Sequence, residues 1–169
     1  PGLAEQFIYF NDDFFLANNT KLEDFFIDNK PLLRGNWSLF YDDIWYKKVK
    51  LFFNKYFQKS KKPYYKHNKG LQKPAEILHF SKYFYTPHIP AIFIKSTLKE
   101  FFDTHKELLI SNIKFKFRKP DQFVAHSLSN HLQIKKENYI HQNKSQLVYF
   151  QNYKKPLWWI KFKLRKIEI

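Results

Sequence analysis

The chain has 169 residues and carries 30 lysines and arginines against 15 aspartates and glutamates, a formal net charge of +15. This length fits one ordinary domain, and a content of 44% hydrophobic and 21% aromatic residues excludes a disordered chain. Because cysteine is absent, the sequence also excludes disulfides, zinc ribbons and thiol nucleophiles. No apolar run approaches the roughly 20 residues that a membrane-spanning helix needs.

The positive charge favours polyanionic partners such as nucleic acid, anionic lipid headgroups or phosphorylated small molecules. The arginines are only Arg34, Arg118 and Arg165, and the other cations are lysines. Proteins that read base edges use arginine for bidentate contacts that lysine makes less well. The composition therefore argues against sequence-specific binding of nucleic acid, and a bias in the coding DNA is an alternative origin for many of the lysines.

The first elements predicted along the chain are a strand and a turn. Residues 7–10, Phe-Ile-Tyr-Phe, predict a buried strand, and Asn11-Asp12-Asp13 predict a polar turn at its carboxyl end. Open α/β sheets bind their ligands at the carboxyl ends of strands. Residues 20–23 match a capping box, which predicts a short helix through residue 26 that Pro31 ends.

The rest of the chain alternates helical and extended patterns. An apolar stripe predicts a helix over residues 44–59, and residues 60–73 predict a basic surface loop. Residues 83–94 predict extended chain, in which Pro87 and Pro90 keep His88 out of a helix. A second capping box predicts a helix over residues 97–110, strict alternation predicts a strand or an extended edge over 113–117, and residues 122–133 predict a second helix. Residues 146–150 and 158–169 predict two short strands.

Asp12 and Asp13 are the sharpest local candidates for a functional site. Adjacent carboxylates after a strand suit a hard cation such as Mg²⁺, which takes one or two carboxylates together with substrate phosphates. The same residues would also serve as an Asx turn that satisfies backbone donors at the end of the strand. A glycosidase with paired carboxylates requires a separation between them that the sequence does not give. The residues alone leave these interpretations open.

His88 and Arg118 are further candidates, each with a structural alternative. The prolines beside His88 would hold it in a rigid loop, where reactive groups are often positioned, although a single histidine is more often structural. Arg118 can clamp a phosphate through its planar guanidinium, or it can form a surface ion pair with Asp121 that contributes little stability. His126 and His131 lie five residues apart on a predicted helix, so they face different directions and do not favour a metal pair.

Two groups of motifs occur in a specific order. The first is residues 1–13, Pro-Gly-Leu-Ala-Glu-Gln-Phe-Ile-Tyr-Phe-Asn-Asp-Asp, followed by Leu22-Glu-Asp-Phe-Phe26. The second is Thr86-Pro-His-Ile-Pro90, the helix near Glu100, and Phe117-Arg118 with Asp121. These groups resemble the second and third conserved regions of the Stealth family of sugar-1-phosphate transferases. That family includes bacterial capsular polysaccharide phosphotransferases and the lysosomal-enzyme N-acetylglucosamine-1-phosphotransferase.

The resemblance implies an enzyme that transfers a sugar-1-phosphate from a nucleotide-diphosphate sugar to a sugar hydroxyl. The product would be a phosphodiester in capsule or surface polysaccharide. The implied fold is α/β, with a glycosyltransferase-A-like nucleotide-sugar-binding core and helical insertions. The implied donor is a nucleotide sugar, and the implied acceptor is a polysaccharide or glycolipid.

The resemblance also assigns roles to individual residues. Asp12 and Asp13 would hold Mg²⁺ or Mn²⁺, and Asn11, Asp12 and Arg118 would bind the donor. His88 would stand near the acceptor as an acid or base, because phosphoryl transfer needs a cation, an arginine and a proton acceptor. The residues implied as catalytic are His88, Asp13, Arg118 and Asp121.

The same resemblance makes the chain a single partial catalytic domain, residues 1–169. The second conserved region covers 1–30, a variable helical and basic insert 44–80, the third region 83–131, and a basic aromatic tail 146–169. The family's first region, with a Val-Asp-Gly-x-Asp-like motif, and its fourth, with an Asn-Asp motif, have no counterpart here. We therefore expect an incomplete core that is impaired in catalysis on its own.

The implied localisation is cytoplasmic, at the inner face of a bacterial membrane. Trp158 and Trp159, among lysines, would contact anionic lipid peripherally. The alternative hypothesis is a basic module that binds nucleic acid or anionic membrane without catalysis. Lysines interleaved with aromatic residues over 46–73 and 153–166 favour it, with nucleic acid the less expected ligand.

Overall fold

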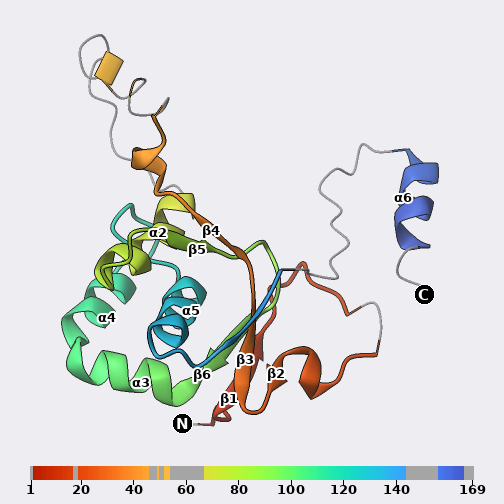
Figure 1. Ribbon diagram of the computed structural model, residues 1–169, viewed down its shortest axis with the longest axis horizontal. Coiled ribbons are helices and arrows are strands. Elements are labelled where there is room, and N and C mark those ends of the chain that lie inside the picture. Colours follow the sequence, from red (N-terminus) through yellow and green to blue (C-terminus); the bar gives the residue numbers. More distant parts are fainter. Residues whose placement is uncertain are drawn as a thin grey trace.

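The computed structural model describes residues 2–16, 19–45, 49, 52–53, 67–143 and 156–165. Helices and strands are mixed along this part of the chain, which confirms the predicted α/β character in general form. Helices lie on one side of the strands in Figure 1, namely α2 (His67–Ile77), α3 (Lys95–Thr104), α4 (Lys106–Ile113) and α5 (Ala125–Lys135). Helix α6 (Leu157–Leu164) lies outside this group.

Within the described residues, the strands form three small sheets. β1 (Gln6–Tyr9) pairs antiparallel with β6 (Ala91–Ile94), and β4 (Asn36–Ser38) pairs antiparallel with β5 (Tyr83–Tyr85). In the third sheet β3 (Lys30–Arg34) is antiparallel to β2 (Phe26–Ile27) and parallel to β7 (Ile140–Gln142). Two 3₁₀ helices, η1 (Leu22–Asp24) and η2 (Tyr41–Asp43), precede β2 and follow β4.

Gly35 joins β3 to β4 at the point where the chain passes close to β5. A Cβ atom at this position would lie 2.3 Å from the backbone oxygen of Tyr85 and 2.7 Å from the ring of Phe84. The Gly35 carbonyl also accepts a hydrogen bond of 2.8 Å from His141 Nε2 in β7. Only glycine fits this close approach, which brings two of the sheets together.

Helix α5 forms the centre of the fold. Residues 127–134 are all buried, and the helix packs against α2, α3, β5 and β6. On one side, Leu128 and Leu132 join Phe101 of α3 in an apolar cluster. A helix surrounded in this way must satisfy its polar side chains inside the protein.

The polar side chains of α5 tie the neighbouring elements to it. Ser127 Oγ donates to the Leu71 carbonyl in α2 at 2.5 Å, and Gln133 Nε2 donates to Thr97 Oγ1 in α3 at 2.7 Å. His131 Nε2 accepts the Phe84 N–H of β5 at 2.9 Å. Among the described residues, no buried polar side-chain atom lacks a hydrogen-bond partner. The helix therefore fixes β5 and the loop that follows it.

The predicted first strand and turn are confirmed, but the helix after them is wrong. β1 is half-buried rather than buried, and the turn closes when Phe14 N–H donates to the Asn11 carbonyl at 3.2 Å. The expected helix through residue 26 is only the three-residue η1, and Pro31 lies inside β3. Phe26 begins β2 instead, because its ring is buried against residues of β6.

The later elements agree in part with the predictions. The extended segment 83–94 is confirmed as β5 and β6 with a loop between them, and the second predicted helix is confirmed as α5. The helix expected over 97–110 begins at Lys95 and breaks at His105 into α3 and α4. The strand expected over 113–117 is wrong, since Ile113 ends α4 and Phe117 is 74% exposed. Alternation of lysine and aromatic residues is not enough to form a strand, and among the described residues no strand pairs with this segment.

The basic segments also differ from expectation. The loop expected over 60–73 is wrong from His67 onward, because α2 begins there. Residues 158–164 are helical in α6 rather than extended. Of the expected helix over 44–59, the structure describes Ile44, which is a half-buried bend, and Trp45, Val49, Phe52 and Phe53, which are helical and exposed. Residues 146–150 lie outside the described residues. In the described part of the chain, no helix combines the length and apolarity needed to cross a membrane.

Candidate active site around Asp13 and His88

Asp13 and His88 lie in direct contact although they are 75 positions apart in the chain. The distance from His88 Nε2 to Asp13 Oδ2 is 3.0 Å, and the side chains are 40% and 61% exposed, respectively. A carboxylate oxygen can only accept, so Nε2 carries the proton of this hydrogen bond. The contact therefore orients the imidazole of His88 at the surface of the protein.

The pairing of β1 with β6 explains this contact. The strands are antiparallel, with Tyr9 opposite Ala91, so the end of β1 meets the beginning of β6. The turn that carries Asp13 and the loop that carries His88 consequently emerge at the same edge. Phe14, one residue after Asp13, packs on the imidazole of His88 with 4.6 Å between ring centroids. The fold thus brings together two residues from separate sequence motifs.

Helix α5 holds the loop of residues 86–90 from its inner side. Asn130 Nδ2 donates to Thr86 Oγ1 at 2.9 Å, while His131 binds the backbone of Phe84 just before the loop. Pro87 and Pro90 restrict the backbone on either side of His88. His88 is therefore placed by a rigid loop.

Two further histidines, His67 and His126, lie close to His88. The pKa of His126 is lowered to about 4, first by burial and then by electrostatic repulsion between its charged form and the nearby His67 and His88. The pKa of His67 is also lowered, by burial and then by the charges of Arg118 and His88. Three histidines, from the start of α2, the loop 86–90 and the first turn of α5, therefore lie near one another and near Arg118. We call His67, His88 and His126 the histidine cluster.

The low pKa of His126 makes folding stability dependent on pH. Between about pH 6.5 and pH 4 the unfolded chain binds a proton at this residue that the folded protein does not, so stability falls as the pH is lowered. Urea unfolding at pH 7 and at pH 5 gives the decrease in the free energy of unfolding between the two pH values. This decrease is expected to be about 2 kcal/mol smaller in His126→Gln than in the wild type. His79→Asn, at an exposed histidine with a φ of 63° that asparagine tolerates, should behave as the wild type does. An equal loss in wild type and His126→Gln would contradict the assignment.

Arg118 and Asp121 lie in different surroundings in the structure. Arg118 is exposed, and its charge acts on His67 of the histidine cluster. Asp121 lines a separate hollow with Lys73 and Phe115, and its backbone carbonyl accepts a hydrogen bond from Lys73 Nζ. The structure therefore groups Arg118 with the histidines, while Asp121 contacts α2.

The turn of Asn11, Asp12 and Asp13 offers hard oxygen ligands to a cation. Asn11 is half-buried and Asp12 is exposed, and Asp13 uses Oδ2 for His88. In the part of the chain that the structure describes, no three or more His, Asp or Glu side chains gather closely enough to hold a metal ion. These residues fit Mg²⁺ or Mn²⁺ in the mode in which one or two carboxylates are completed by water and substrate phosphates.

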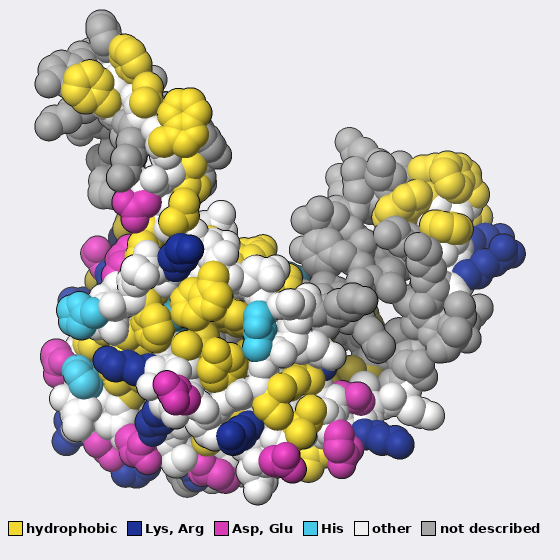
Figure 2. Space-filling model, viewed as in Figure 1, with side chains coloured by type: hydrophobic (Ala, Val, Ile, Leu, Met, Phe, Trp, Pro, Cys, Tyr) yellow, Lys and Arg dark blue, Asp and Glu magenta, His cyan; other side chains and the backbone are white. Residues whose placement is uncertain are grey.

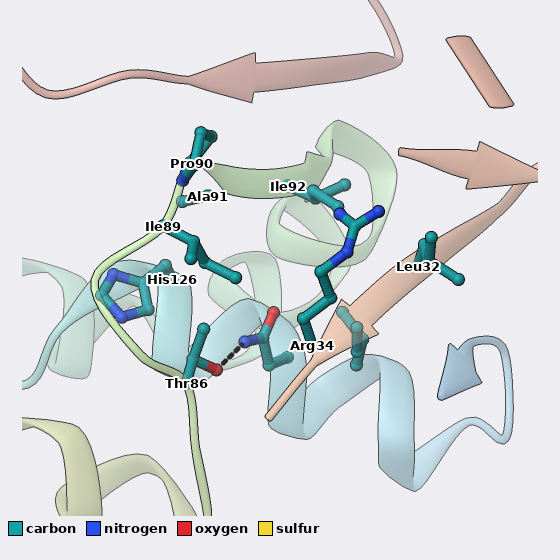
Figure 3. A pocket seen from close by; sticks show the side chains of 10 residues that line it. Leu32, Arg34, Thr86, Ile89, Pro90, Ala91, Ile92 and His126 are labelled. Atoms are coloured by element: carbon teal, nitrogen blue, oxygen red, sulfur yellow. Dashed lines mark hydrogen bonds between the residues drawn. The ribbon is translucent and has the colours of Figure 1, made fainter. Parts of the chain in front are cut away.

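A pocket beside the loop 86–90 contains residues that the sequence patterns did not single out (Figure 3). Arg34 and His126 lie on opposite sides of it, with Ile89 between them. Thr86 and Asn130 complete its polar lining. Distant segments of the chain build this pocket, so no local motif marks it. The scarcity of arginine was the one available signal for Arg34.

Comparison with known proteins finds one relevant similarity. The chain is similar to the capsular polysaccharide phosphotransferase WcwK of Streptococcus pneumoniae, with 31% identity over 157 residues, covering 83% of this chain and 46% of that protein. The chain thus spans about half the length of this curated relative. No protein-family model and no solved structure matches the chain. WcwK is a relative of the kind that the Stealth resemblance implies, because capsular polysaccharide phosphotransferases are among the members of that family.

Proposed function

We propose that this chain is part of a Stealth-family transferase that moves a sugar-1-phosphate from a nucleotide-diphosphate sugar to a sugar hydroxyl in capsule or surface polysaccharide synthesis. The observation that carries the proposal is the contact between Asp13 and His88, which joins two motifs that resemble conserved regions of the family. The similarity to WcwK supports the same class of reaction. In this proposal residues 1–30 and 83–131 belong to a glycosyltransferase-A-like core, and the reaction takes place at the inner face of a bacterial membrane.

The proposed chemistry uses His88 as the proton acceptor. The acceptor hydroxyl oxygen forms a bond to the phosphorus next to the sugar, and the bond from that phosphorus to the nucleoside monophosphate breaks. His88 Nδ1 takes the proton of the hydroxyl. Asp13 holds the Nε2 proton, which orients the ring and stabilises the imidazolium that forms. The phosphodiester and the nucleoside monophosphate are the products.

Charge neutralisation is the second requirement of phosphoryl transfer. Arg118, beside the histidine cluster, would bind phosphate oxygens of the donor. A divalent cation at Asp12 and Asp13 would supply neutralisation of the diphosphate charge. Asn11 would orient the donor from the same turn, and Asp121 remains the proposed positioning residue for Arg118 or His88.

The test is release of nucleoside monophosphate from a nucleotide sugar by the full-length protein, with Mg²⁺ present and an oligosaccharide acceptor. Removal of Mg²⁺ with a chelator should abolish release, and added Mg²⁺ should restore it. Release that continues unchanged without divalent cations would contradict the cation assignment. Absence of release with every nucleotide sugar tried would contradict the reaction itself.

A second proposed role concerns helix α6, which we propose contacts an anionic membrane surface. Leu157, Trp158 and Phe162 are 66%, 69% and 54% exposed, and the cations Lys161 and Arg165 are exposed beside them. Figure 2 shows this apolar surface next to positive side chains. Eight residues are too few to cross a bilayer. Exposed tryptophan flanked by cations is typical of a helix that lies in the headgroup region.

Replacing both Trp158 and Phe162 by serine is expected to weaken binding to vesicles that contain phosphatidylserine by about tenfold or more, because two large apolar side chains no longer enter the interface. The matched control is Phe117→Ser, at an exposed aromatic residue outside α6, which should leave binding unchanged. Co-sedimentation measures both. Equal binding by the double variant and the wild type would contradict the role of α6, and tight, salt-dependent binding of DNA or RNA instead would favour a nucleic-acid-binding module.

A further inference from the structure

Arg34 is a partly buried cation at the end of β3. Its Nε donates to Gln142 Oε1 in β7 at 2.7 Å, and its Nη2 donates to the carbonyl of Asp24. Burial lowers the pKa of Arg34, and the charge of Asp24 opposes that effect. The Asp24 carboxylate itself accepts a hydrogen bond from the Lys21 backbone N–H at 2.7 Å. Among the described residues, no carboxylate forms an ion pair with Arg34.

Neither of the two hydrogen bonds of this half-buried guanidinium goes to a carboxylate, and a bound anion would offset part of its desolvation cost. Arg34 has five N–H donors, and the bonds to Gln142 and Asp24 fix the plane of the group at the wall of the pocket. A fixed planar fork matches the two oxygens of a phosphate or carboxylate better than a lysine would. The framework around Arg34 therefore orients it for an oxyanion.

The opposite wall of the pocket supports the same ligand class. Thr86 Oγ1 accepts a hydrogen bond from the Asn130 amide, and a hydroxyl that accepts can still donate its own proton to a ligand. His126 lies across the pocket from Arg34 (Figure 3) and can donate one ring N–H. Ile89 forms an apolar surface between them. A ligand here would meet donors on two sides.

The position of the pocket relates it to the candidate active site. Thr86 and His88 are two residues apart, which is about 7 Å of extended backbone. We propose that Arg34, Thr86 and His126 form a subsite that binds an oxyanion of the substrate, a phosphate monoester or a carboxylate, beside the Asp13–His88 pair. The role of this subsite in the reaction rests on the proposed transfer function, whereas its ability to bind an oxyanion does not.

The chain offers a direct test because its arginines are only Arg34, Arg118 and Arg165. Each gives one Nε–H signal in a ¹H–¹⁵N correlation spectrum, which single Arg→Lys variants assign. Inorganic phosphate should shift the Arg34 signal in a saturating manner and leave that of Arg165 unchanged. A shift confined to Arg118, or equal linear shifts of all the signals, would overturn the proposal.

Further ligands identify the source of the oxyanion. If a hexose 1-phosphate saturates the shift of the Arg34 signal at a lower concentration than glucuronate does, the ligand is a phosphate ester. If glucuronate saturates it at the lower concentration, the ligand is an acidic sugar. Glucose should produce no shift, and an equal response to glucose would contradict an oxyanion site.

Variants test the same subsite without catalysis. Arg34→Gln should weaken phosphate binding by about tenfold or more, and Arg34→Lys, which keeps the charge and guards against misfolding, should give an intermediate loss. Lys82→Gln, at an exposed cation outside both proposed binding sites, is the control and should bind as the wild type does. Wild-type affinity in a folded Arg34→Gln would overturn the proposal. Asp13→Asn should lose transfer but keep the Arg34 shift, so failure of the transfer function and failure of the subsite are distinguishable.

Discussion

Replacing Asp13 by asparagine is expected to lower the rate of nucleoside monophosphate release by about 10²–10⁴-fold. The carboxylate holds His88 at 3.0 Å and would stabilise the positive charge that the imidazole gains when it accepts a proton. Asparagine has nearly the same size but no charge, so the orienting contact weakens and the stabilisation of imidazolium disappears. His88→Gln should cause a loss of similar size, because no proton acceptor remains at that position.

The Asp13→Asn and His88→Gln substitutions should affect the free energy of unfolding much less than they affect turnover. The Asp13–His88 pair is exposed on both sides, and pairs of this kind contribute little to the free energy of unfolding. The control is Asp28→Asn, which makes the same chemical change at an exposed turn residue with a φ of 49° that asparagine tolerates. Asp28→Asn should retain wild-type turnover. An Asp13→Asn protein that works within threefold of the wild type would contradict a role for Asp13 in the reaction.

His131→Leu is expected to lower the free energy of unfolding by about 2–4 kcal/mol. His131 is fully buried, and its Nε2 accepts the Phe84 N–H at 2.9 Å, while Nδ1 donates to the Ser127 carbonyl at 2.7 Å. Burial also lowers its pKa, which keeps the ring neutral in this arrangement. Leucine fills much of the volume but leaves the buried N–H of Phe84 without an acceptor.

Urea unfolding at pH 7 measures this loss. His131→Gln should lose less than His131→Leu, because a side-chain carbonyl can accept the Phe84 N–H. His79→Asn, an exposed position, should lie within about 0.5 kcal/mol of the wild type. A loss below about 0.5 kcal/mol in His131→Leu would show that α5 does not fix β5 through this residue. Because Phe84 precedes the loop of His88, the same variant should also reduce turnover.

Local sequence patterns predicted the parts of the site that depend on neighbouring residues. The aromatic run before Asn11 becomes β1, and Pro87 and Pro90 hold His88 in a loop. Both features arise within a few residues of chain, where turn chemistry and proline geometry dominate. The resemblance to the Stealth motifs associated Asp13 with His88, and the β1–β6 register explains why the two residues meet.

Other features depended on tertiary contacts that no local pattern contains. The spacing of His126 and His131 relates these residues only to each other, whereas the structure puts His126 near His67 and buries His131 against Phe84. Arg34 gains its place from the parallel pairing of β3 with β7, which are more than 100 residues apart. The alternating segment 113–117 failed as a strand because neighbouring strands, rather than alternation, decide whether a sheet forms.

A double-mutant cycle on Asp13 and His88 tests the central claim most directly. Turnover is measured for the wild type, Asp13→Asn, His88→Gln and the double variant, all in the full-length protein with Mg²⁺. If the two residues act as one unit, the double variant should be no slower than the slower single variant, which corresponds to strong non-additivity. Losses that simply multiply would show that Asp13 and His88 act independently. Wild-type turnover in either single variant would contradict the proposed active site.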